Sequence, residues 1–242
     1  LNVGQPRMTP RTLHLAEPVD GLPPGIRAWS TTKANGSFGL GSDEPVGAVM
    51  GRWGALLADL GDLGVERLAT AHQVHGAAVV THGAGWRGWL RGMDADGHVT
   101  VARGTALAVT VADCTPVLLW HPGGAIAALH AGWRGTAAEI LDRGLDALAA
   151  LGFPEEECAM WLGPSICGQC YEVGPEVLRA VHGGAHHGKG LLDVRAALAR
   201  QAARRHVATV RTASGCSRCD NARYFSHRSG DAGRMLGIIA LT

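Results

Sequence analysis

A strong net charge is the first feature that this sequence lacks. Its 22 Lys and Arg residues nearly balance its 21 Asp and Glu residues, which gives a formal net charge of +1 over 242 residues. No run of like charges gathers either sign in one segment. Because nucleic acids and acidic membrane surfaces attract basic patches, the sequence disfavours both as partners.

Long hydrophobic runs are also absent. The most apolar stretch, residues 106–120, is interrupted by Asp113 and falls short of the roughly 20 apolar residues that a membrane-spanning helix needs. Residues 1–7 contain neither a basic region followed by an apolar stretch nor a small-residue cleavage site. We therefore expect a cytoplasmic protein without a membrane partner. Because Met8 follows shortly after, we expect residues 1–7 to be an expression remnant or an extended start, and they do not enter the fold prediction.

Cysteine is scarce, with six residues in the chain. Six are too few for the disulfide framework of a small secreted protein, so we expect thiols or metal ligands. Four of them form two Cys-x-x-Cys pairs, Cys167 with Cys170 and Cys216 with Cys219. Two such pairs can build a closed zinc site, but the 45 residues between them exceed the usual zinc-ribbon spacing. Neither pair begins a helix after a clear strand, which disfavours a redox role, and their function is left open.

Glycine, by contrast, is abundant, with 35 residues that punctuate the chain. Short elements joined by tight connections favour one layered, mixed α/β (α+β) domain over residues 1–242, with helices packed on mixed β-sheets. Helical periodicity predicts helices over residues 50–60, 136–151, 175–181 and 192–206. Strands are predicted over residues 76–81, 106–111, 116–120, 125–130, 158–162, 207–211 and 235–241. Several of these strands are apolar throughout, which predicts burial on both faces.

Three short segments place metal-competent side chains where strands are expected to end, and in the last two of them the strand is apolar. They contain His75, Cys114 and His130. Strand ends beside tight turns are where α/β proteins hold rigid sites. Two imidazoles and one thiolate suit a catalytic zinc ion that keeps its fourth position open for water.

The same residues allow two other interpretations. Cys114 can be an inert buried thiol beside structural histidines, although the combination of three such residues weakens this interpretation. Cys114 can also be a nucleophile with His130 as its base, 16 residues later. The pattern does not separate ligand from nucleophile. We expect Asp113 to orient a neighbour or cap a turn, because alternation along a strand turns it away from Cys114.

The segment after His130 turns through glycines into a predicted helix, with Arg134 at its entrance. Helix N-termini with free amides and an adjacent guanidinium attract phosphate or carboxylate groups. On its own this signal is weak, because Thr136 can simply be an N-cap.

Together these segments resemble the bacterial laccase-domain proteins, formerly called multicopper polyphenol oxidases, which are related to a purine-metabolising enzyme of vertebrate macrophages. In order, the matching motifs are Gln-Val-His-Gly at residues 73–76, Ala-Asp-Cys-x-Pro at 112–116 and His-Ala-Gly-Trp-Arg-Gly at 130–135. Further matches are Ala95-Asp96, Val99-Thr100, Gly163-Pro164, residues 170–174, Asp193, residues 226–228 and residues 233–235. The likeness runs from about residue 72 to the C-terminus.

The resemblance implies that His75, Cys114 and His130 bind zinc and carry catalysis, with copper and phenol oxidation reported for some relatives. It also implies phosphorolysis of adenosine, inosine and methylthioadenosine, and deamination of adenosine, with purine nucleosides and phosphate as partners. Arg134 is our candidate for binding phosphate, and Asp96 is a candidate for binding substrate. The implied fold is related to that of a deamidase toxin with a Cys/His dyad, which keeps the nucleophile interpretation open.

The sequence departs from the family pattern upstream of these motifs. Relatives usually carry a Thr-x-Arg-x-Gly-Gly-x-Ser loop, whereas residues 31–37 have Lys33 in place of Arg and are one residue shorter. Lys cannot form the bidentate fork that Arg forms with an anion. We therefore expect a changed affinity or choice of substrate, with Lys33 and Ser37 as candidate substrate-binding residues.

The resulting prediction is a zinc-dependent enzyme acting on purine nucleosides. Its rivals are a cysteine amidase or hydrolase with a Cys114/His130 dyad and a metal-dependent phenol oxidase. The oxidase is disfavoured because multicopper oxidases arrange about ten His ligands in His-x-His pairs. The 12 His residues of this chain show no such pattern. A protein-interaction module would leave the polar strand ends unexplained, and the sequence indicates no oligomeric state.

Overall fold

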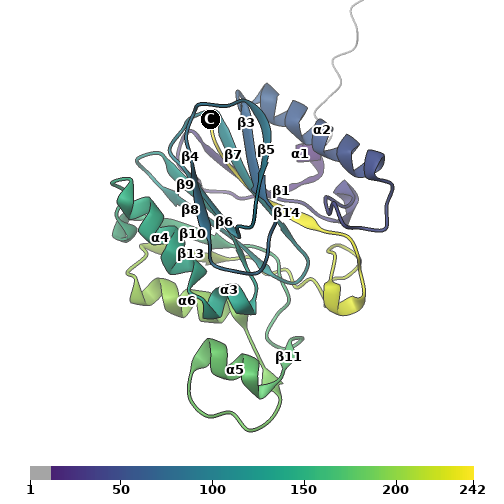
Figure 1. The fold of residues 1–242 in the computed structure, drawn as a ribbon, viewed down its shortest axis with the longest axis vertical. Coiled ribbons are helices and arrows are strands. Elements are labelled where there is room, and N and C mark those ends of the chain that lie inside the picture. The colour runs from purple at the N-terminus through teal and green to yellow at the C-terminus, as the bar shows by residue number, and fades with distance from the viewer. Residues whose placement is uncertain (1–11) are drawn as a thin grey trace, which may run out of the picture.

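The computed structural model describes residues 12–242, which form two six-stranded sheets with helices on their outer faces (Figure 1). Residues 1–7 lie outside the described residues. In spatial order, the first sheet contains β1 (Glu17–Pro18), β2 (Ile26–Ser30), β14 (Met235–Leu241), β7 (Thr105–Val111), β3 (Arg67–Ala71) and β5 (Gly88–Gly92). The second contains β13 (Thr209–Thr212), β10 (Ala159–Leu162), β8 (Thr115–His121), β9 (Ala125–Ala131), β6 (Gly97–Thr100) and β4 (Val79–His82). Both sheets mix parallel and antiparallel pairs, which confirms the mixed α/β class.

The helices gather on opposite sides of the two sheets (Figure 1). They are α1 (Thr12–Leu15), α2 (Val46–Asp62), α3 (Trp133–Ala137), α4 (Ile140–Ala150), α5 (Pro175–His182) and α6 (Val194–Arg204), with 3-10 turns at Lys33–Asn35, Glu155–Glu157 and His227–Ser229. A small ribbon pairs β11 (Glu172–Val173) with β12 (Gly190–Leu191). Within residues 12–242, no helix combines the length and the apolar character that a membrane crossing requires.

Side chains alternate along the central strands and fill three layers of core. On β14, Ile238 packs in the cluster under α2, whereas Ile239 packs between the sheets. On β8, Leu118 lies between the sheets and Leu119 lies in the cluster under α4 and α6. Because successive strand residues point to opposite faces, strands with apolar cores on both sides are apolar throughout, as the sequence analysis predicted.

The longest helix, α2, covers the outer face of the first sheet. Val49, Trp53, Leu56 and Leu60 recur at helical spacing and are its buried apolar face. Trp53 stacks on Trp89 of β5, with ring centroids 4.4 Å apart. Both rings also line a cavity of the protein.

The single helix predicted over residues 136–151 is wrong, because the chain breaks into α3 and α4. Glu139 lies between them in the left-handed region, at φ 60°, which costs about 1–2 kcal/mol for a residue other than glycine. The break lets α3 pack against α5 while α4 packs against β9. The first helix begins at Trp133 with Gly132 as its N-cap, so Arg134 lies within the first turn and Thr136 is not the cap.

Several other predicted elements begin a few residues later than expected. The helix expected over residues 192–206 begins at Val194, because the carboxylate of Asp193 accepts a hydrogen bond from the N–H of Ala196 and caps it. The strand expected over residues 76–81 begins at Val79, because residues 74–76 wrap around a buried carboxylate. The sequence analysis did not predict α1 or the strands β1, β2, β3, β5, β6, β11 and β12.

Candidate active site

His75, Cys114 and His130 meet at the seam between the two sheets. His75 lies in the loop after β3, Cys114 in the turn from β7 to β8, and His130 near the end of β9. One ligand atom of each residue lies within 4.8 Å of those of the other two. The imidazole centroids of His75 and His130 are 4.8 Å apart, and the ring planes make an angle of 75°. The structure thus brings together the three residues that the sequence analysis proposed as one site.

Strand pairing accounts for this convergence. β8 and β9 pair with Thr115 opposite Ala131, so Cys114 and Gly132 follow as neighbours one residue further on. A Cβ atom at Gly132 would lie 2.9 Å from Sγ of Cys114 and 3.3 Å from Cδ2 of His75. Glycine at this position therefore leaves the space that the thiol and the imidazole occupy.

Asp96 anchors the cluster from behind. Its side chain is fully buried, and the pairing of β6 with β9 places it opposite His130. Its Oδ1 lies 2.8 Å from Nδ1 of His130, and its oxygens accept hydrogen bonds from the backbone N–H groups of residues 74–76. Because Nδ1 of His130 is committed to Asp96, Nε2 is the nitrogen left for Cys114 or a metal ion. Asp96 has no exposed surface, which does not fit the substrate contact that the sequence analysis expected. Its hydrogen bonds instead position His130 and the loop of residues 74–76.

The charges of the cluster stabilise one another. Burial alone would raise the pKa of the Cys114 thiol, but the charge of His130 and the hydrogen bonds from both imidazoles lower this pKa to about 6. Burial alone would lower the pKa of His130, but the Cys114 thiolate and Asp96 raise it to about 9. Burial would also raise the pKa of Asp96, but the hydrogen bonds from His130 and the backbone lower it. The cluster therefore favours a thiolate beside an imidazolium at neutral pH, and a thiolate is the form that binds metal or attacks an electrophile.

This donor set fits one transition-metal ion. Two imidazole nitrogens and one thiolate are ligands that zinc accepts in catalytic sites, and a carboxylate behind a ligating imidazole is the usual supporting contact. His130 is buried, whereas His75 is exposed, so the cluster is closed on the protein side and open on the other. A fourth ligand would come from that open side.

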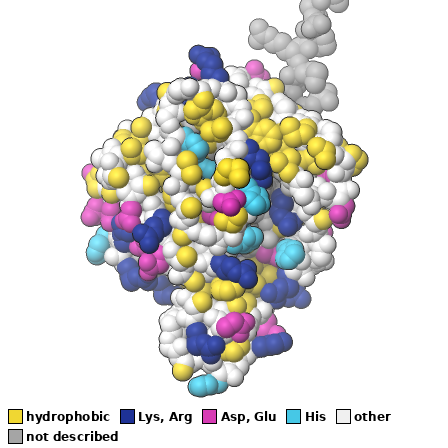
Figure 2. Space-filling model, viewed as in Figure 1, with side chains coloured by type: hydrophobic (Ala, Val, Ile, Leu, Met, Phe, Trp, Pro, Cys, Tyr) yellow, Lys and Arg dark blue, Asp and Glu magenta, His cyan; other side chains and the backbone are white. Residues whose placement is uncertain are grey.

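A cavity of about 680 Å³ opens beside the cluster, a volume within the usual range for small-molecule sites. Figure 2 shows histidine and basic side chains close together near the middle of the molecular face. Aromatic and cationic side chains share the cavity wall, namely Phe38, Trp53, Trp89, Trp133 and Tyr171 with Arg91, Arg134, Arg228 and Arg234. Among the described residues, Asp113 is the one acidic side chain of the wall. Such a wall suits a flat aromatic ring joined to an anion.

Asp113 holds the turn that carries Cys114. Its φ of 78° is left-handed, and its side chain accepts hydrogen bonds from Oγ of Ser217 at 2.5 Å and from the N–H of Arg228 at 2.6 Å. Asp113 therefore orients neighbouring loops, in agreement with the sequence analysis.

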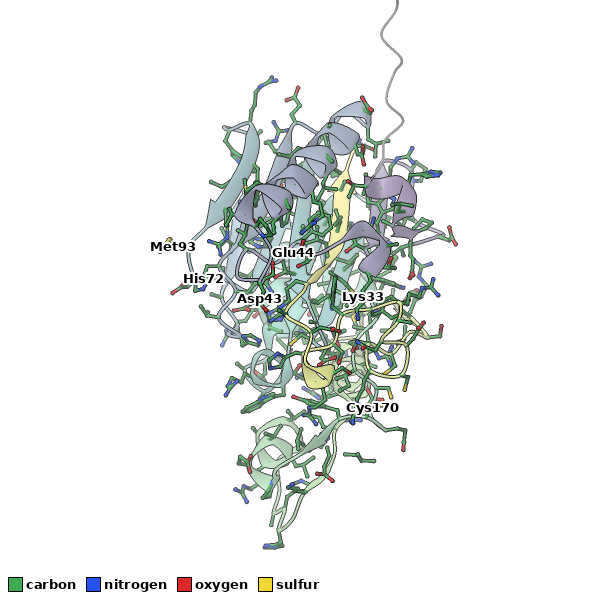
Figure 3. The ribbon with its side chains drawn as sticks, turned by 90° about the vertical axis from the view of Figure 1, so that its right-hand side faces the viewer. Lys33, Asp43, Glu44, His72, Met93 and Cys170 are labelled. Atoms are coloured by element: carbon green, nitrogen blue, oxygen red, sulfur yellow. The ribbon has the colours of Figure 1, made fainter. Side chains whose placement is uncertain are left out.

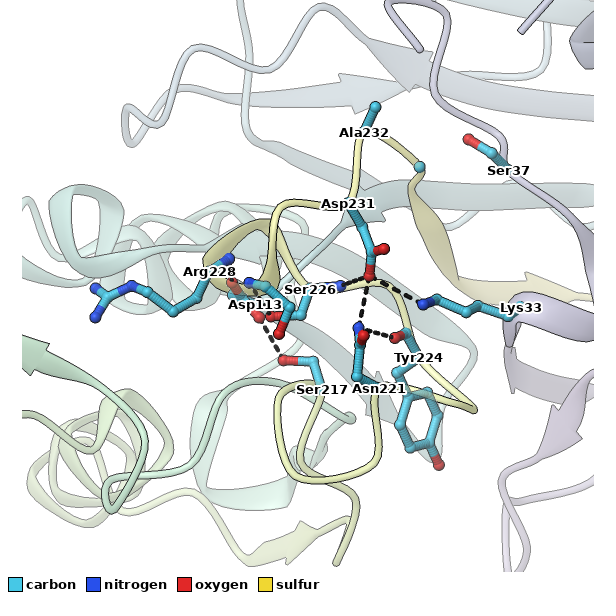
Figure 4. A network of polar contacts seen from close by, with 12 residues as sticks. Lys33, Ser37, Asp113, Ser217, Asn221, Tyr224, Ser226, Arg228, Asp231 and Ala232 are labelled. Carbon is cyan, nitrogen blue, oxygen red and sulfur yellow. Dashed lines mark hydrogen bonds and ion pairs between the residues drawn. The ribbon is translucent and has the colours of Figure 1, made fainter. Parts of the chain in front are cut away.

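Of the other predicted binding residues, Arg134 borders the cavity, with its guanidinium 4.6 Å from the ring centroid of Trp133. Lys33 and Ser37 do not border it. Nζ of Lys33 pairs with Asp231 at 3.0 Å (Figure 4). Oγ of the buried Ser37 accepts hydrogen bonds from two backbone N–H groups, one of them that of Arg234, so Ser37 supports the wall from behind.

Gln73 has a role that the sequence analysis did not assign. Its Oε1 accepts hydrogen bonds from the N–H and the hydroxyl of Thr110, and its Nε2 donates to the carbonyl of Thr110. This clamp ties the loop of His75 to β7. The family motifs could have pointed to Gln73, because it lies in one of them, as do Tyr171 and Arg228. The cavity residues Trp89 and Arg91 lie in none of these motifs.

Comparison with known proteins gives concordant similarities. The model of a family described as multi-copper polyphenol oxidoreductase laccase matches residues 30–242. A purine nucleoside phosphorylase of Streptomyces coelicolor is 38% identical over 191 residues, covering 74% of this chain and 78% of that protein. An adenosine deaminase from an unknown prokaryotic organism is 35% identical over 154 residues, covering 57% of this chain and 58% of that protein. The crystal structure of a Neisseria meningitidis protein superposes with a TM-score of 0.78 at 28% identity, covering 94% of this chain and 99% of that one.

Proposed function

Since the chain belongs to the family described as multi-copper polyphenol oxidoreductase laccase, which has relatives named purine nucleoside phosphorylase and adenosine deaminase, we propose that it is a zinc-dependent enzyme acting on purine nucleosides. The proposed reactions are phosphorolysis of adenosine, inosine and methylthioadenosine, and deamination of adenosine. The observation that carries the proposal is the His75/Cys114/His130 cluster beside a cavity walled by aromatic rings and arginines.

The two kinds of side chain in the wall match the two parts of the substrates. Aromatic faces stack on a purine, and guanidinium groups bind phosphate through paired N–H donors. Arg134 stacks on Trp133, and Arg228 stacks on Tyr171 with 4.9 Å between the guanidinium carbon and the ring centroid. Stacking holds each guanidinium in a fixed direction, so less freedom is lost when it binds an anion.

His75, Cys114 and His130 would hold the zinc ion. When bound, zinc supplies a Lewis acid and lowers the pKa of a water molecule to about 7. The chain supplies the orientation: Asp96 keeps His130 in one tautomer, Gln73 holds the loop of His75 against β7, and the aromatic wall excludes water from a bound base.

The first test is incubation of the pure protein with adenosine and phosphate, with and without a chelator. We expect adenine and ribose 1-phosphate from phosphorolysis and inosine from deamination, with both activities lost on chelation and restored by zinc. Arg134→Ala should raise the KM for phosphate about 10-fold, because it removes a charge-assisted contact. Arg87→Ala is the matched control, since Arg87 is exposed, pairs with Glu66 and does not border the cavity.

A cysteine hydrolase is the second candidate, because Cys114, His130 and Asp96 also stand in the order of nucleophile, base and orienting carboxylate. The same experiment separates the two. Turnover that survives full removal of metal but is abolished by Cys114→Ser would replace the zinc enzyme with the hydrolase.

A further inference from the structure

Four cysteines that the proposed reactions do not use meet outside the cavity. Cys167 and Cys170 lie in the loop after β10, and Cys216 and Cys219 lie in the loop after β13. Their four sulfur atoms lie within 4.8 Å of one another. Sγ of Cys219 is 3.3 Å from Sγ of Cys170 and 4.0 Å from Sγ of Cys167.

The 45 residues between the pairs, which the sequence analysis counted against a shared site, are bridged by the second sheet. β10 and β13 are parallel neighbours, with Leu162 opposite Thr212. Both loops therefore leave the same edge of the sheet. Beyond the strands they stay in contact, because Ser165 and Cys216 form an isolated bridge and Nη1 of Arg218 donates to the carbonyl of Cys170 at 3.0 Å.

The sulfur positions fit a single metal ion. A tetrahedral zinc site with Zn–S bonds of about 2.3 Å holds its sulfur atoms ~3.8 Å apart. A disulfide needs about 2.05 Å between sulfur atoms, and all four cysteines are free thiols. A cluster of several iron ions would hold its cysteine sulfurs further apart than one ion does.

Backbone groups are arranged as they are around metal-bound thiolates. The N–H groups of Cys167 and Cys219 point at Sγ of Cys216, at 3.3 and 3.4 Å. Hydrogen bonds of this kind stabilise a ligating sulfur and orient it. Cys216 is buried and Cys219 is exposed, so the cluster lies at the surface with one ligand on its inner side.

We propose that Cys167, Cys170, Cys216 and Cys219 bind one zinc ion in a closed structural site, separate from the site of Cys114. Four thiolates fill a tetrahedral shell and leave no position for substrate. None of the four borders the cavity.

The two loops that this ion would join form part of the cavity wall. Tyr171 follows Cys170 directly, and Arg228 lies nine residues after Cys219. Both side chains border the cavity, and the Arg228 guanidinium stacks on the Tyr171 ring. Figure 3 shows Cys170 next to the C-terminal segment that carries the second loop.

The same loops hold the turn of Cys114. Asp113 accepts hydrogen bonds from Ser217, which lies between Cys216 and Cys219, and from the N–H of Arg228 (Figure 4). The carbonyl of Asp113 accepts from the N–H of Ile166 at 3.0 Å, next to Cys167. The zinc ion would thus fix the wall and the turn of the catalytic cluster without touching a substrate.

The test is the zinc content of protein purified under reducing conditions. We expect about two zinc ions per chain in the wild type and about one in a variant that combines His75→Ala with Cys114→Ala. X-ray absorption at the zinc edge of this double variant should show four sulfur neighbours at about 2.3 Å. A double variant that is folded but holds no zinc would overturn the proposal. One zinc in the wild type with only sulfur neighbours would instead contradict the catalytic site proposed above.

A second pair of variants gives an independent check. Cys216→Ala combined with Cys219→Ala should lose about one zinc ion per chain and lower the melting temperature. The control is Cys158→Ala, which removes a free cysteine outside both clusters and should keep both ions. An unchanged zinc content in the first variant would contradict the proposal. If this variant does not fold, the absorption spectrum of the His75/Cys114 double variant decides.

Discussion

The cluster of His75, Cys114 and His130 and the cluster of four cysteines differ in their donors and in what surrounds them. The first mixes nitrogen and sulfur donors, has a buried carboxylate behind it and faces a cavity of about 680 Å³. The second has only sulfur donors, is braced by backbone N–H groups and joins two loops. This difference corresponds to the division between catalytic zinc sites, which keep a position open, and structural sites, which are closed. In the two proposals, one chain of this size separates the chemistry from the bracing of its loops.

The largest expected effect is the loss of activity when the cluster of His75, Cys114 and His130 is changed. Cys114→Ser should lower kcat/KM for adenosine phosphorolysis on the order of 10³-fold or more. When residues act as one catalytic unit, removing one of them loses most of the effect of the whole unit. The variant that combines Cys216→Ala with Cys219→Ala should lose less than about 10-fold, since it acts through loop position. Steady-state kinetics at saturating phosphate compare the two. Equal losses would show that the clusters do not differ in role.

The next effect concerns the carboxylate that only the first cluster has. Asp96→Asn keeps the shape but removes the charge behind His130, so zinc affinity should fall about 10–100-fold. Competition with a chromogenic chelator measures this affinity. Asp94→Asn is the control, because Asp94 is exposed and pairs with the exposed His72, and its zinc affinity should stay unchanged. A wild-type zinc affinity in Asp96→Asn would show that Asp96 does not support metal binding by His130.

A pH titration of thiol reactivity sharpens the comparison in metal-free protein. The imidazoles lower the pKa of Cys114 to about 6, and burial with neighbouring glutamates raises the pKa of Cys158 to about 12. The thiolate is the reactive form, so alkylation of Cys114 should rise about 10-fold from pH 5 to pH 7 and then level off. Cys158 should stay unlabelled over this range. Peptide mass spectrometry after iodoacetamide treatment measures both, and a Cys114 rate that still rises steeply above pH 8 would contradict the imidazole pairing.

The smallest expected effect concerns Lys33, which lies outside the cavity wall. Lys33→Ala should change the KM for phosphate less than about 3-fold, because Lys33 pairs with Asp231 and does not border the cavity. Initial-rate measurements at varied phosphate compare it with Arg134→Ala. A larger change in the KM for phosphate in Lys33→Ala than in Arg134→Ala would indicate that Lys33 binds phosphate.

The parts of the fold that the sequence predicted are those with a simple burial pattern. The strand predicted over residues 235–241 matches β14, and those over 116–120 and 125–130 match β8 and β9 within one residue at each end. All three lie between two apolar layers. β3 and β5 were missed because residues such as Arg67 and Arg91 interrupt the apolar pattern. The break at Glu139 was missed because neither glycine nor proline marks it.

The sites divide in the same way. Cys114 and His130 could be predicted because each follows or ends an apolar strand, whereas His75 was found through the Gln-Val-His-Gly motif at residues 73–76. The positioning role of Asp96 depends on the register of β6 against β9, and the convergence of the four cysteines depends on the parallel pairing of β10 with β13. Both are contacts between segments that lie far apart in the sequence, and residue spacing along the chain does not reveal such contacts.

The most direct test of the central claim is anomalous diffraction at the zinc edge from crystals of active protein. The account predicts a zinc peak about 2.3 Å from Sγ of Cys114 and about 2.0–2.1 Å from one nitrogen each of His75 and His130. Active crystals in which these side chains contact only one another, with no anomalous peak between them, would contradict it.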